Sequence, residues 1–318
     1  MTPCYHPLER TELLFPARDY VTGDSFEIRR CGGCGLTLTW PPPPPSEMGR
    51  YYPDAYYGDA GEKRFVGPVE RMQRALYGSR ARRVEAAAGG SPGRVLDVGC
   101  GRGFLLDAFR RRGWTVEGTE MSAASSAHAR EVLGIPVHIG ALESLALPAG
   151  SFDAVTLWHV LEHVTDPGSL LGEIGRLLRP GGALLVSVPN FGSPEARLAG
   201  PGWFHLDAPR HLVHFTPESL GACLSRAGFE TLESRFFAPE FDSFSFVQST
   251  LNRIGLRQNA LYDTLRGRAA KLGAEGGGAS AVASVLLAAP LGILSLPATL
   301  ATGLAGAGST LTVLARRQ

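Results

Sequence analysis

A glycine-rich turn after an apolar run is the strongest sign of chemistry in this sequence. Residues 95–106 read VLDVGCGRGFLL, a predicted buried strand followed by Gly99, Gly101 and Gly103 and then by a helix start. Glycine has no Cβ, so the backbone amides of such a turn can approach a ligand closely. Glu120 follows about twenty residues later, at the end of the next predicted strand, where an acidic side chain can bind ribose hydroxyls.

The glycine spacing differs from that of dinucleotide-binding proteins. Phe104 stands where the dinucleotide fingerprint has its third glycine, and this weakens the case for a nicotinamide or flavin cofactor. Glycine turns also serve the plain packing of a strand on a helix, so the glycines alone are a weak signal. Asp97 in the strand and Glu120 after the next strand make ligand binding the stronger interpretation.

A second group of residues suited to chemistry is rich in histidine. His159, Glu162 and His163 follow the predicted strand at 152–158 with helical spacing. Ligands bind at the carboxyl ends of the strands in an open α/β sheet, so these side chains could form a catalytic base or a metal site. A further polar cluster follows the next predicted strand and consists of His205, Asp207, Arg210, His211 and His214.

Three of the 5 cysteines lie near the start of the chain. Cys31-Gly-Gly-Cys34-Gly has the form of a zinc knuckle. We predict a structural zinc ion bound by Cys4, His6, Cys31 and Cys34, with a metal-free remnant as the alternative. Cys100, inside the glycine turn, is expected to be a small buried residue rather than a nucleophile.

Length and composition exclude several classes of protein. The chain has 318 residues, of which 44% are hydrophobic and 19% charged, and this excludes a polar disordered chain. The formal net charge is +1 and there is no local basic patch, so we expect no nucleic-acid partner. The cysteines are too few for a disulfide scaffold and residues 1–10 lack the apolar core of a signal peptide, so we expect a cytoplasmic location.

The elements that must position these residues alternate in type along the chain. From residue 94 to residue 237, short β-branched runs alternate with helical segments, a pattern that predicts parallel βαβ units. The predicted strands are 94–98, 115–119, 136–139, 152–158, 182–188 and 231–237, with a seventh at 309–315. We therefore predict an α/β fold with a doubly wound sheet.

The same patterns divide the chain into four predicted segments. These are a zinc-knuckle-like segment with a proline spacer (1–45), a core (46–237), a helical insertion (238–308) and the last strand of the core sheet (309–318). The run Pro41–Pro45 is expected to form a stiff polyproline II spacer. An aromatic loop follows, with Tyr51, Tyr52, Tyr56 and Tyr57, and it is either a lid or a packing loop.

The second half of the insertion is almost entirely apolar. No charged residue occurs from Gly276 to Ala315, but Pro290 and Pro297 divide the stretch into pieces shorter than the about 20 residues of a membrane span. We predict an apolar hairpin whose two ends lie on the same side. Three roles stay open for residues 280–306: peripheral membrane contact, a cap over an apolar acceptor, or a homodimer surface.

With these motifs in this order, the sequence resembles the class I S-adenosylmethionine-dependent methyltransferases over most of residues 45–318. The resemblance implies a seven-stranded Rossmann-like sheet with an antiparallel last strand, and S-adenosylmethionine as the cofactor. It implies that Asp97, Gly99, Cys100, Gly101 and Gly103 hold the methionine part, Glu120 the ribose, and Met121, Ala141 and Leu142 the adenine.

Two further motifs, WHVLEHVTDP at 158–167 and HLDAPRHLVHFTPESL at 205–220, are similar to the small-molecule branch of this family. The ubiquinone-pathway O-methyltransferases carry a carboxylate where this chain has His159, and in them the cluster binds a divalent metal. We expect His159 and His211 to be the candidate bases, and Glu162 and His163 to be structural.

The resemblance predicts methyl transfer to an oxygen of a small or lipid-linked acceptor by a cytoplasmic enzyme, and the apolar stretch leaves an association with membranes open. Two alternatives stay open. One is a catalytically silent module that binds S-adenosylmethionine and acts through its zinc knuckle and apolar hairpin. The other is a methyltransferase for sugars or natural-product scaffolds. The sequence does not distinguish carbon, nitrogen and oxygen acceptors.

Overall fold

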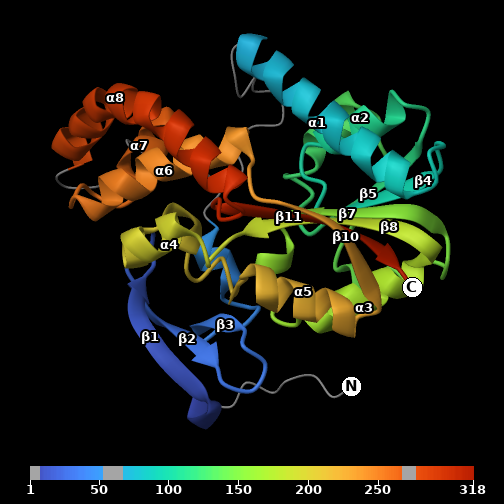
Figure 1. The fold of residues 1–318 in the computed structure, drawn as a ribbon, viewed down its shortest axis with the longest axis horizontal. Coiled ribbons are helices and arrows are strands. Elements are labelled where there is room, and N and C mark those ends of the chain that lie inside the picture. The colour runs from blue at the N-terminus through green and yellow to red at the C-terminus, as the bar shows by residue number, and fades with distance from the viewer. Residues whose placement is uncertain (1–7, 53–66, 267–276) are drawn as a thin grey trace.

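The fold centres on a seven-stranded mixed sheet (Figure 1). The computed structural model describes residues 8–52, 67–266 and 277–318. In order across the sheet, the strands are β10 (Phe229–Arg235), β11 (Thr310–Arg317), β8 (Leu178–Pro189), β7 (Phe152–Trp158), β4 (Arg94–Val98), β5 (Thr115–Glu120) and β6 (Val137–Ile139). β11 pairs antiparallel with β8 and β10, and the remaining neighbours are parallel. The predicted mixed sheet with an antiparallel last strand is confirmed.

Helices cover both faces of this sheet (Figure 1). On one face lie α1 (Gly67–Ala87) and α2 (Phe104–Arg110), and on the other lie α3 (Pro167–Leu177) and α5 (Pro217–Arg226). Their apolar residues belong to two separate core clusters, one on each side of the central strands. Burial on both faces explains why β4, β7 and β8 are rich in apolar residues. The predicted doubly wound α/β fold is confirmed.

A second, four-stranded sheet contains the N-terminal part of the described chain. Its strands are β1 (Thr11–Arg18), β2 (Ser25–Cys31), β3 (Thr37–Trp40) and β9 (Val213–His214). β9 comes from the core and pairs with β3 opposite Thr37 and Leu38, and so covers an edge that would otherwise present unpaired backbone groups. The sequence predicts that Pro41–Pro45 sets residues 1–45 apart, whereas this pairing joins β3 directly to the core.

Three helices form the insertion between β10 and β11: α6 (Pro239–Arg253), α7 (Ala260–Leu265) and α8 (Gly277–Leu304). The predicted hairpin broken at Pro290 and Pro297 is wrong. Both prolines lie inside α8, which continues through them as one arched helix packed on α6 and α7 (Figure 1). A proline inside a helix removes one hydrogen bond and bends the axis, but the surrounding alanine and leucine residues favour the helix.

One further helix, α4 (Pro194–Ala199), and several single-turn helices complete the connections. The single-turn helices are η1 (Leu8–Arg10), η2 (Met48–Tyr51), η4 (His128–Val132), η5 (Leu142–Ser144), η6 (Leu161–His163), η7 (Gly200–Gly202) and η8 (Phe204–Leu206). Three of them carry histidines, and two of these lie beside the central strands: η6 follows β7, and η8 precedes β9. Both therefore bring imidazole side chains to the carboxyl end of the central strands.

Candidate active site

The predicted glycine turn connects β4 to α2. Gly99 has φ +69°, and a Cβ there would lie 2.5 Å from Val160 Cγ2, so the turn packs against the loop after β7. Gly101 has φ +49°, and a Cβ there would meet no atom of the described residues within 4 Å. The turn therefore needs glycine for its backbone conformation and its close packing, and it leaves space at Gly101 where a ligand can approach backbone amides.

Glu120, at the end of β5, faces this turn. Its carboxylate accepts hydrogen bonds from the backbone N–H groups of Gly101 at 3.1 Å, Met121 at 2.8 Å and Ser122 at 3.3 Å. Met121 is 71% exposed, so its side chain is available to a ligand. The structure brings Glu120 and the glycine turn together, and ribose binding by Glu120 stays a prediction.

Asp97 lies at the buried end of β4, just before the turn. Its Oδ1 accepts a 2.5 Å hydrogen bond from Thr156 Oγ1 of β7. Burial raises the pKa of the Asp97 carboxyl to about 7, while the Thr156 hydrogen bond opposes this shift and the charge of Glu120 adds to it. Asp97 can therefore change its charge near neutral pH, and a cation bound beside it would favour the ionised form.

Three of the remaining residues predicted to contact the cofactor, Cys100, Gly103 and Leu142, are buried. Cys100 packs so closely on Gly118 that a Cβ on this glycine would lie 2.5 Å from the Cys100 sulfur. Burial raises the pKa of the Cys100 thiol, which makes it a packing residue rather than a nucleophile. Leu142 belongs to the core, whereas Ala141 is exposed just before η5. The loop can therefore offer a bound base its backbone and the Ala141 side chain.

His159 follows β7 directly and has φ +54°, a conformation uncommon for residues other than glycine. Its Nδ1 lies 3.1 Å from Glu162 Oε1, and its buried Nε2 has no hydrogen-bond partner among the described residues. The ring of Phe241 from α6 packs on it, with the ring centroids 4.6 Å apart. Burial lowers the pKa of His159 to about 3, and nearby Arg80 contributes, so the imidazole is neutral at physiological pH.

His205 of η8 stacks on His159, with ring centroids 6.2 Å apart and ring planes 16° apart. Burial lowers the pKa of His205 to about 3, and His159 contributes. His205 Nε2 and Trp158 Nε1 are also buried and have no hydrogen-bond partner within the described part of the chain. A buried polar atom without a partner costs about 1–3 kcal/mol, so three such atoms on neighbouring rings would favour the binding of a polar ligand there.

An ion pair between two helices far apart in the sequence lies over these residues. Arg80 of α1 pairs with Glu240 of α6, and the Arg80 guanidinium lies 3.6 Å from the centroid of the Trp158 ring. Burial lowers the pKa of Arg80 to about 10, so the guanidinium stays charged. We call Trp158, His159, His205 and Arg80 the β7-end cluster. The sequence carries no motif for Arg80, because its role depends on contacts with separate elements.

Glu162 also lies beside two further histidines. Each of Glu162, His163 and His211 offers one atom that could bind a metal ion, and these three atoms lie within 4.8 Å of one another. His163 Nδ1 lies 2.9 Å from Arg210 O and His211 Nδ1 lies 2.7 Å from His205 O. Because a carbonyl only accepts, both Nδ1 atoms carry the proton and both Nε2 atoms present lone pairs. Burial raises the pKa of Glu162 and lowers those of both histidines, so this group could share a proton or hold a divalent cation.

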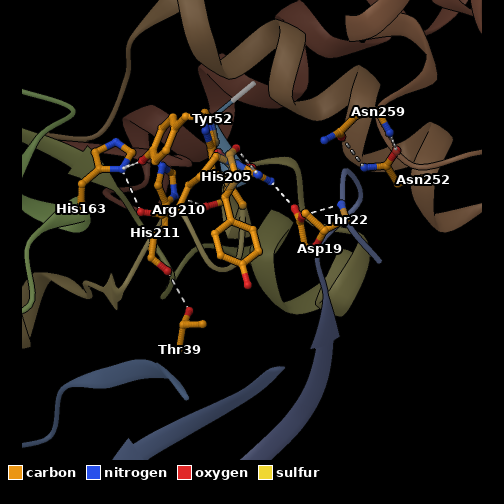
Figure 2. A network of polar contacts seen from close by, with 12 residues as sticks. Asp19, Thr22, Thr39, Tyr52, His163, His205, Arg210, His211, Asn252 and Asn259 are labelled. Atoms are coloured by element: carbon orange, nitrogen blue, oxygen red, sulfur yellow. Dashed lines mark hydrogen bonds and ion pairs between the residues drawn. The ribbon is translucent and has the colours of Figure 1, made fainter. Parts of the chain in front are cut away.

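The loop that carries these histidines is held by the N-terminal sheet (Figure 2). Fully buried Arg210 pairs with Asp19 at 2.7 Å and with Asp207 at 2.8 Å, and it donates to Tyr51 O at 3.0 Å. Asp19 lies in the turn between β1 and β2 and is 191 positions away from Arg210. The sequence analysis missed Asp19, because no local pattern predicts a contact over this separation.

The aromatic loop is described in part. Tyr51 is buried and donates to Asp24 Oδ2 at 2.9 Å, and it is therefore a packing residue. The Tyr52 hydroxyl lies 3.2 Å from His163 Nδ1, so Tyr52 reaches the histidine group (Figure 2). Tyr56 and Tyr57 lie outside the described residues, and the proposed lid stays a prediction.

The predicted zinc ligands also lie only partly within the described residues. Cys31 ends β2, and Cys34 lies in the turn that leads to β3. Gly35 N–H donates to Cys31 O at 2.9 Å and closes this turn. Cys4 and His6 lie outside the described residues, and the zinc site stays a prediction.

The fold and the cofactor-binding features together define a class of protein. β11 lies antiparallel between β8 and β10, a glycine turn follows β4, and an acidic residue ends β5. These features are typical of the class I S-adenosylmethionine-dependent methyltransferases, the family that the sequence resembles.

Comparisons with known proteins agree with this class. A family model described as a methyltransferase domain matches residues 69–234. The ubiquinone biosynthesis O-methyltransferase of Pseudomonas aeruginosa (strain LESB58) is 36% identical over 160 residues, which cover 46% of this chain and 68% of the relative. That of Xanthomonas axonopodis pv. citri (strain 306) is 33% identical over 176 residues, which cover 52% of this chain and 73% of the relative. The chain belongs to the methyltransferase family and is an S-adenosylmethionine-dependent methyltransferase.

A solved structure shows the same fold. A crystal structure from Galdieria sulphuraria, described as a proposed sarcosine dimethylglycine methyltransferase, superimposes with a TM-score of 0.51 at 13% sequence identity. The similarity covers 86% of this chain and 98% of that chain. At this identity the similarity concerns the fold alone.

Proposed function

We propose that the enzyme transfers the methyl group of S-adenosylmethionine to an oxygen atom of a small or lipid-linked acceptor. The observation that carries this proposal is the pair of buried imidazoles, His159 and His205, whose Nε2 atoms have no hydrogen-bond partner among the described residues. They lie at the end of β7, beside the loop that packs on Gly99. A hydroxyl group bound here would satisfy both atoms.

The residues around the glycine turn fit S-adenosylmethionine. The open backbone at Gly101 suits the methionine part, and the Glu120 carboxylate beside it suits the ribose hydroxyls. The exposed side chain of Met121 and the loop of Ala141 and Leu142 would lie beside the adenine. When bound, the cofactor supplies a methyl group on a positively charged sulfur, and an ionised Asp97 would stabilise the positive charge.

His159 is the first candidate for the catalytic base. Methyl transfer to a hydroxyl requires close alignment and removal of the hydroxyl proton. When His159 Nδ1–H donates to Glu162 Oε1, at 3.1 Å, its Nε2 is left with a free lone pair. Because burial lowers the pKa of His159 to about 3, this nitrogen is unprotonated at physiological pH and can accept a hydrogen bond from a hydroxyl, but it is a weaker base than an exposed imidazole. We assign Glu162 the role of orienting the imidazole, as carboxylates do in other histidine-dependent sites.

His211 is the second candidate for the base. Its Nδ1–H is fixed by the His205 carbonyl, and its Nε2 lies in the group with Glu162 and His163. If His211 takes the proton, His211→Ala should lower kcat far more than it changes the Kd for S-adenosylmethionine. An unchanged kcat would rule out this role and leave His159 as the base.

The acceptor class is proposed from two observations. The relatives reported above are named ubiquinone biosynthesis O-methyltransferases, and the outward side of α8 is apolar. Both favour an acceptor with a long apolar part, and we propose an enzyme that works in the cytoplasm at a membrane surface. A sugar or a natural-product scaffold is the alternative acceptor.

Methyl-labelled S-adenosylmethionine tests the acceptor class directly. Purified protein is incubated with the labelled cofactor and a host-cell lysate, and the organic and aqueous extracts are counted separately. We expect label in the organic extract, and its loss with His159→Gln. Label confined to the aqueous extract would replace the lipid-linked acceptor by a sugar or a soluble scaffold.

We also propose that Cys31 and Cys34, together with Cys4 and His6, hold a structural zinc ion. The turn that Gly35 closes between the two described cysteines supports this assignment, because such turns suit tetrahedral zinc. Plasma mass spectrometry should find equimolar zinc, and chelation should unfold the N-terminal sheet. A stable protein free of zinc would refute the site.

A further inference from the structure

The outward side of α8 is a continuous apolar surface. Its large apolar side chains are between 38% and 82% exposed and comprise Val282, Val285, Leu286, Leu287, Ile293, Leu294, Leu296, Leu300 and Leu304. From Gly278 to Leu304 the mean hydropathy is 2.0. Single exposed apolar residues are normal on a soluble protein, but nine along one helix require an apolar partner.

The polarity of α8 is inverted with respect to a helix that packs on a soluble core. Ser284, Ser295 and Thr299 are buried, and the hydroxyls of Ser295 and Thr299 donate to carbonyl oxygens of α8 itself. Beside them, Ala288 and Leu291 pack on α6 and α7. An amphipathic helix in water places its polar residues outward. α8 instead turns hydroxyl groups inward and its bulkiest apolar residues outward, as expected where the surroundings are apolar.

α8 lies along the protein and cannot cross a bilayer by itself in this arrangement. It packs on α6 and α7, and Ser280 near its start accepts a hydrogen bond from Arg257 N–H at 3.4 Å. Its end leads within a few residues to β11 of the central sheet. A helix of this length extends about 40 Å at about 1.5 Å per residue. Its outward side therefore forms a long strip on one side of the molecule.

The charges around α8 favour an anionic partner. In the described part of the insertion, 239–266 and 277–304, the acidic residues are buried and comprise Glu240, Asp242 and Asp263. Arg253 is exposed, and Arg257 and Arg266 are partly exposed. Asp263 is paired with Arg257 at 2.8 Å, so no described carboxylate of the insertion faces the solvent. Cationic residues beside an apolar strip are typical of surfaces that bind anionic lipid headgroups.

We infer that the outward side of α8 docks into the headgroup–acyl boundary of an anionic membrane leaflet. A second copy of the chain fits this surface less well, because packing two such surfaces on each other would bring their exposed Arg253 side chains together, whereas the acidic residues of the described insertion are buried. The helix beneath this surface also contacts the site. Phe241 at the start of α6 packs on His159, while Val247 and Leu251 of the same helix pack against α8.

Membrane docking does not depend on the proposed acceptor, because it is inferred from α8 and its neighbours alone. It nevertheless has a consequence for the reaction if the acceptor is lipid-linked. The inward side of α8 packs on α6, and Phe241 of α6 packs on His159, so docking would hold the site two helix layers away from the leaflet that contains the acceptor.

Vesicle flotation tests the inference on the full chain. The protein should float with vesicles of phosphatidylglycerol and phosphatidylcholine, bind less to phosphatidylcholine alone, and dissociate partly at high salt. The variant Leu286→Gln/Ile293→Gln/Leu300→Gln should lose at least about tenfold in partitioning, because each buried leucine or isoleucine contributes about 1.5–3 kcal/mol. Arg253→Gln should reduce binding to the anionic vesicles only.

Two controls keep the experiment decisive. Val132→Gln/Leu232→Gln changes exposed apolar residues outside the insertion and should float like the wild type. Circular dichroism and S-adenosylmethionine binding show whether the triple variant is folded, and Leu286→Gln alone replaces it if it is not. A wild-type protein that stays with the soluble fraction in both vesicle types overturns the inference. If light scattering then finds a dimer that the α8 variant abolishes, the occupant of the surface is a second copy.

Discussion

The two halves of the active site are built on different principles. On one side, Asp97, Gly101 and Glu120 form what we call the cofactor edge, where both carboxylates already accept hydrogen bonds from the protein. On the other side, the β7-end cluster contains Nε2 of His159 and Nε2 of His205, which are buried and have no hydrogen-bond partner among the described residues. The cofactor edge is complete before a ligand binds, whereas the β7-end cluster needs a ligand to complete it.

This difference assigns distinct tasks to the two halves. Polar groups that satisfy one another hold a rigid shape, which suits a cofactor that is the same in every reaction of the family. Buried polar atoms without partners make an empty site costly, and they favour a ligand with matching donors. The acceptor should therefore depend on the β7-end cluster, and the cofactor on the edge around Gly101.

Removing the imidazole of His159 should give the largest difference between the effect on kcat and the effect on cofactor binding. In His159→Gln, kcat should fall by about 100-fold to 10,000-fold, the usual contribution of a general base, while the Kd for S-adenosylmethionine stays unchanged. Single-turnover kinetics and isothermal titration measure the two quantities. The control is His138→Gln, a partly exposed histidine paired with Glu117 on the outer strands. An equal loss of cofactor affinity in His159→Gln would show that the two halves are not separate.

Breaking the buried Asp19–Arg210 pair should destabilise the loop that carries His205, and with it the β7-end cluster. Asp19→Asn leaves the fully buried guanidinium with one charged partner fewer, and we expect a loss of about 3 kcal/mol in the free energy of unfolding. Urea denaturation measures this loss. Glu47→Gln, at an exposed ion pair with Arg50, should change stability by less than about 1 kcal/mol. If both variants unfold alike, the N-terminal sheet does not support the histidine loop.

Neutralising Glu120 should weaken cofactor binding and leave the rate of the reaction at saturating cofactor unchanged. Hydrogen bonds to a charged group are worth about 1.5–3 kcal/mol, so Glu120→Gln should raise the Kd for S-adenosylmethionine by about tenfold or more. At saturating cofactor, kcat should remain close to that of the wild type. A variant with normal affinity and reduced kcat would contradict the placement of the ribose at Glu120.

The pH dependence of cofactor binding should show the smallest effect. The pKa of Asp97 is raised from 3.8 to about 7 in the ligand-free protein, so its ionised fraction increases as the pH rises through 7. A cationic ligand binds the ionised form better, and affinity should increase with pH by at most about tenfold per unit. The stability of the folded protein should change with pH in the opposite direction. The contribution of Asp97 to the free energy of unfolding is fully present below its unfolded pKa and is lost as the pH rises through about 7.

Calorimetric titrations from about pH 6 to about pH 8 on wild type and Asp97→Asn measure this effect. The affinity of Asp97→Asn should be flat over this range. A pH dependence that persists in the variant would assign the titration to another group, such as Glu195, whose pKa burial also raises to about 7.

The comparison also explains which parts of the site could be predicted from the sequence. The glycine turn, Asp97 and Glu120 lie close together in the chain, and their roles depend on the ends of two adjacent strands. Local spacing is therefore sufficient to predict that they meet. The β7-end cluster combines residues of α1, β7 and η8 under α6, and no pattern in the sequence specifies that these elements converge.

Two differences between prediction and structure have a physical cause. Pro290 and Pro297 predict a broken helix, but a proline with suitable flanking residues bends a helix instead of ending it. The proline run after β3 predicts a separate N-terminal segment. The pairing of β3 with β9 depends on strands more than 170 positions apart, and such contacts leave no mark in the local sequence.

The position of the insertion would allow it to be replaced without disturbing the central sheet. α6, α7 and α8 connect β10 and β11, two adjacent antiparallel strands, and Arg235 at the end of β10 pairs with Thr312 near the start of β11. The chain thus leaves and re-enters the sheet at neighbouring points, where a short turn could replace all three helices. Because Glu240 and Phe241 of α6 contact the β7-end cluster, one exchange of this segment between homologues would change both the proposed acceptor site and the proposed membrane-docking surface in a single step.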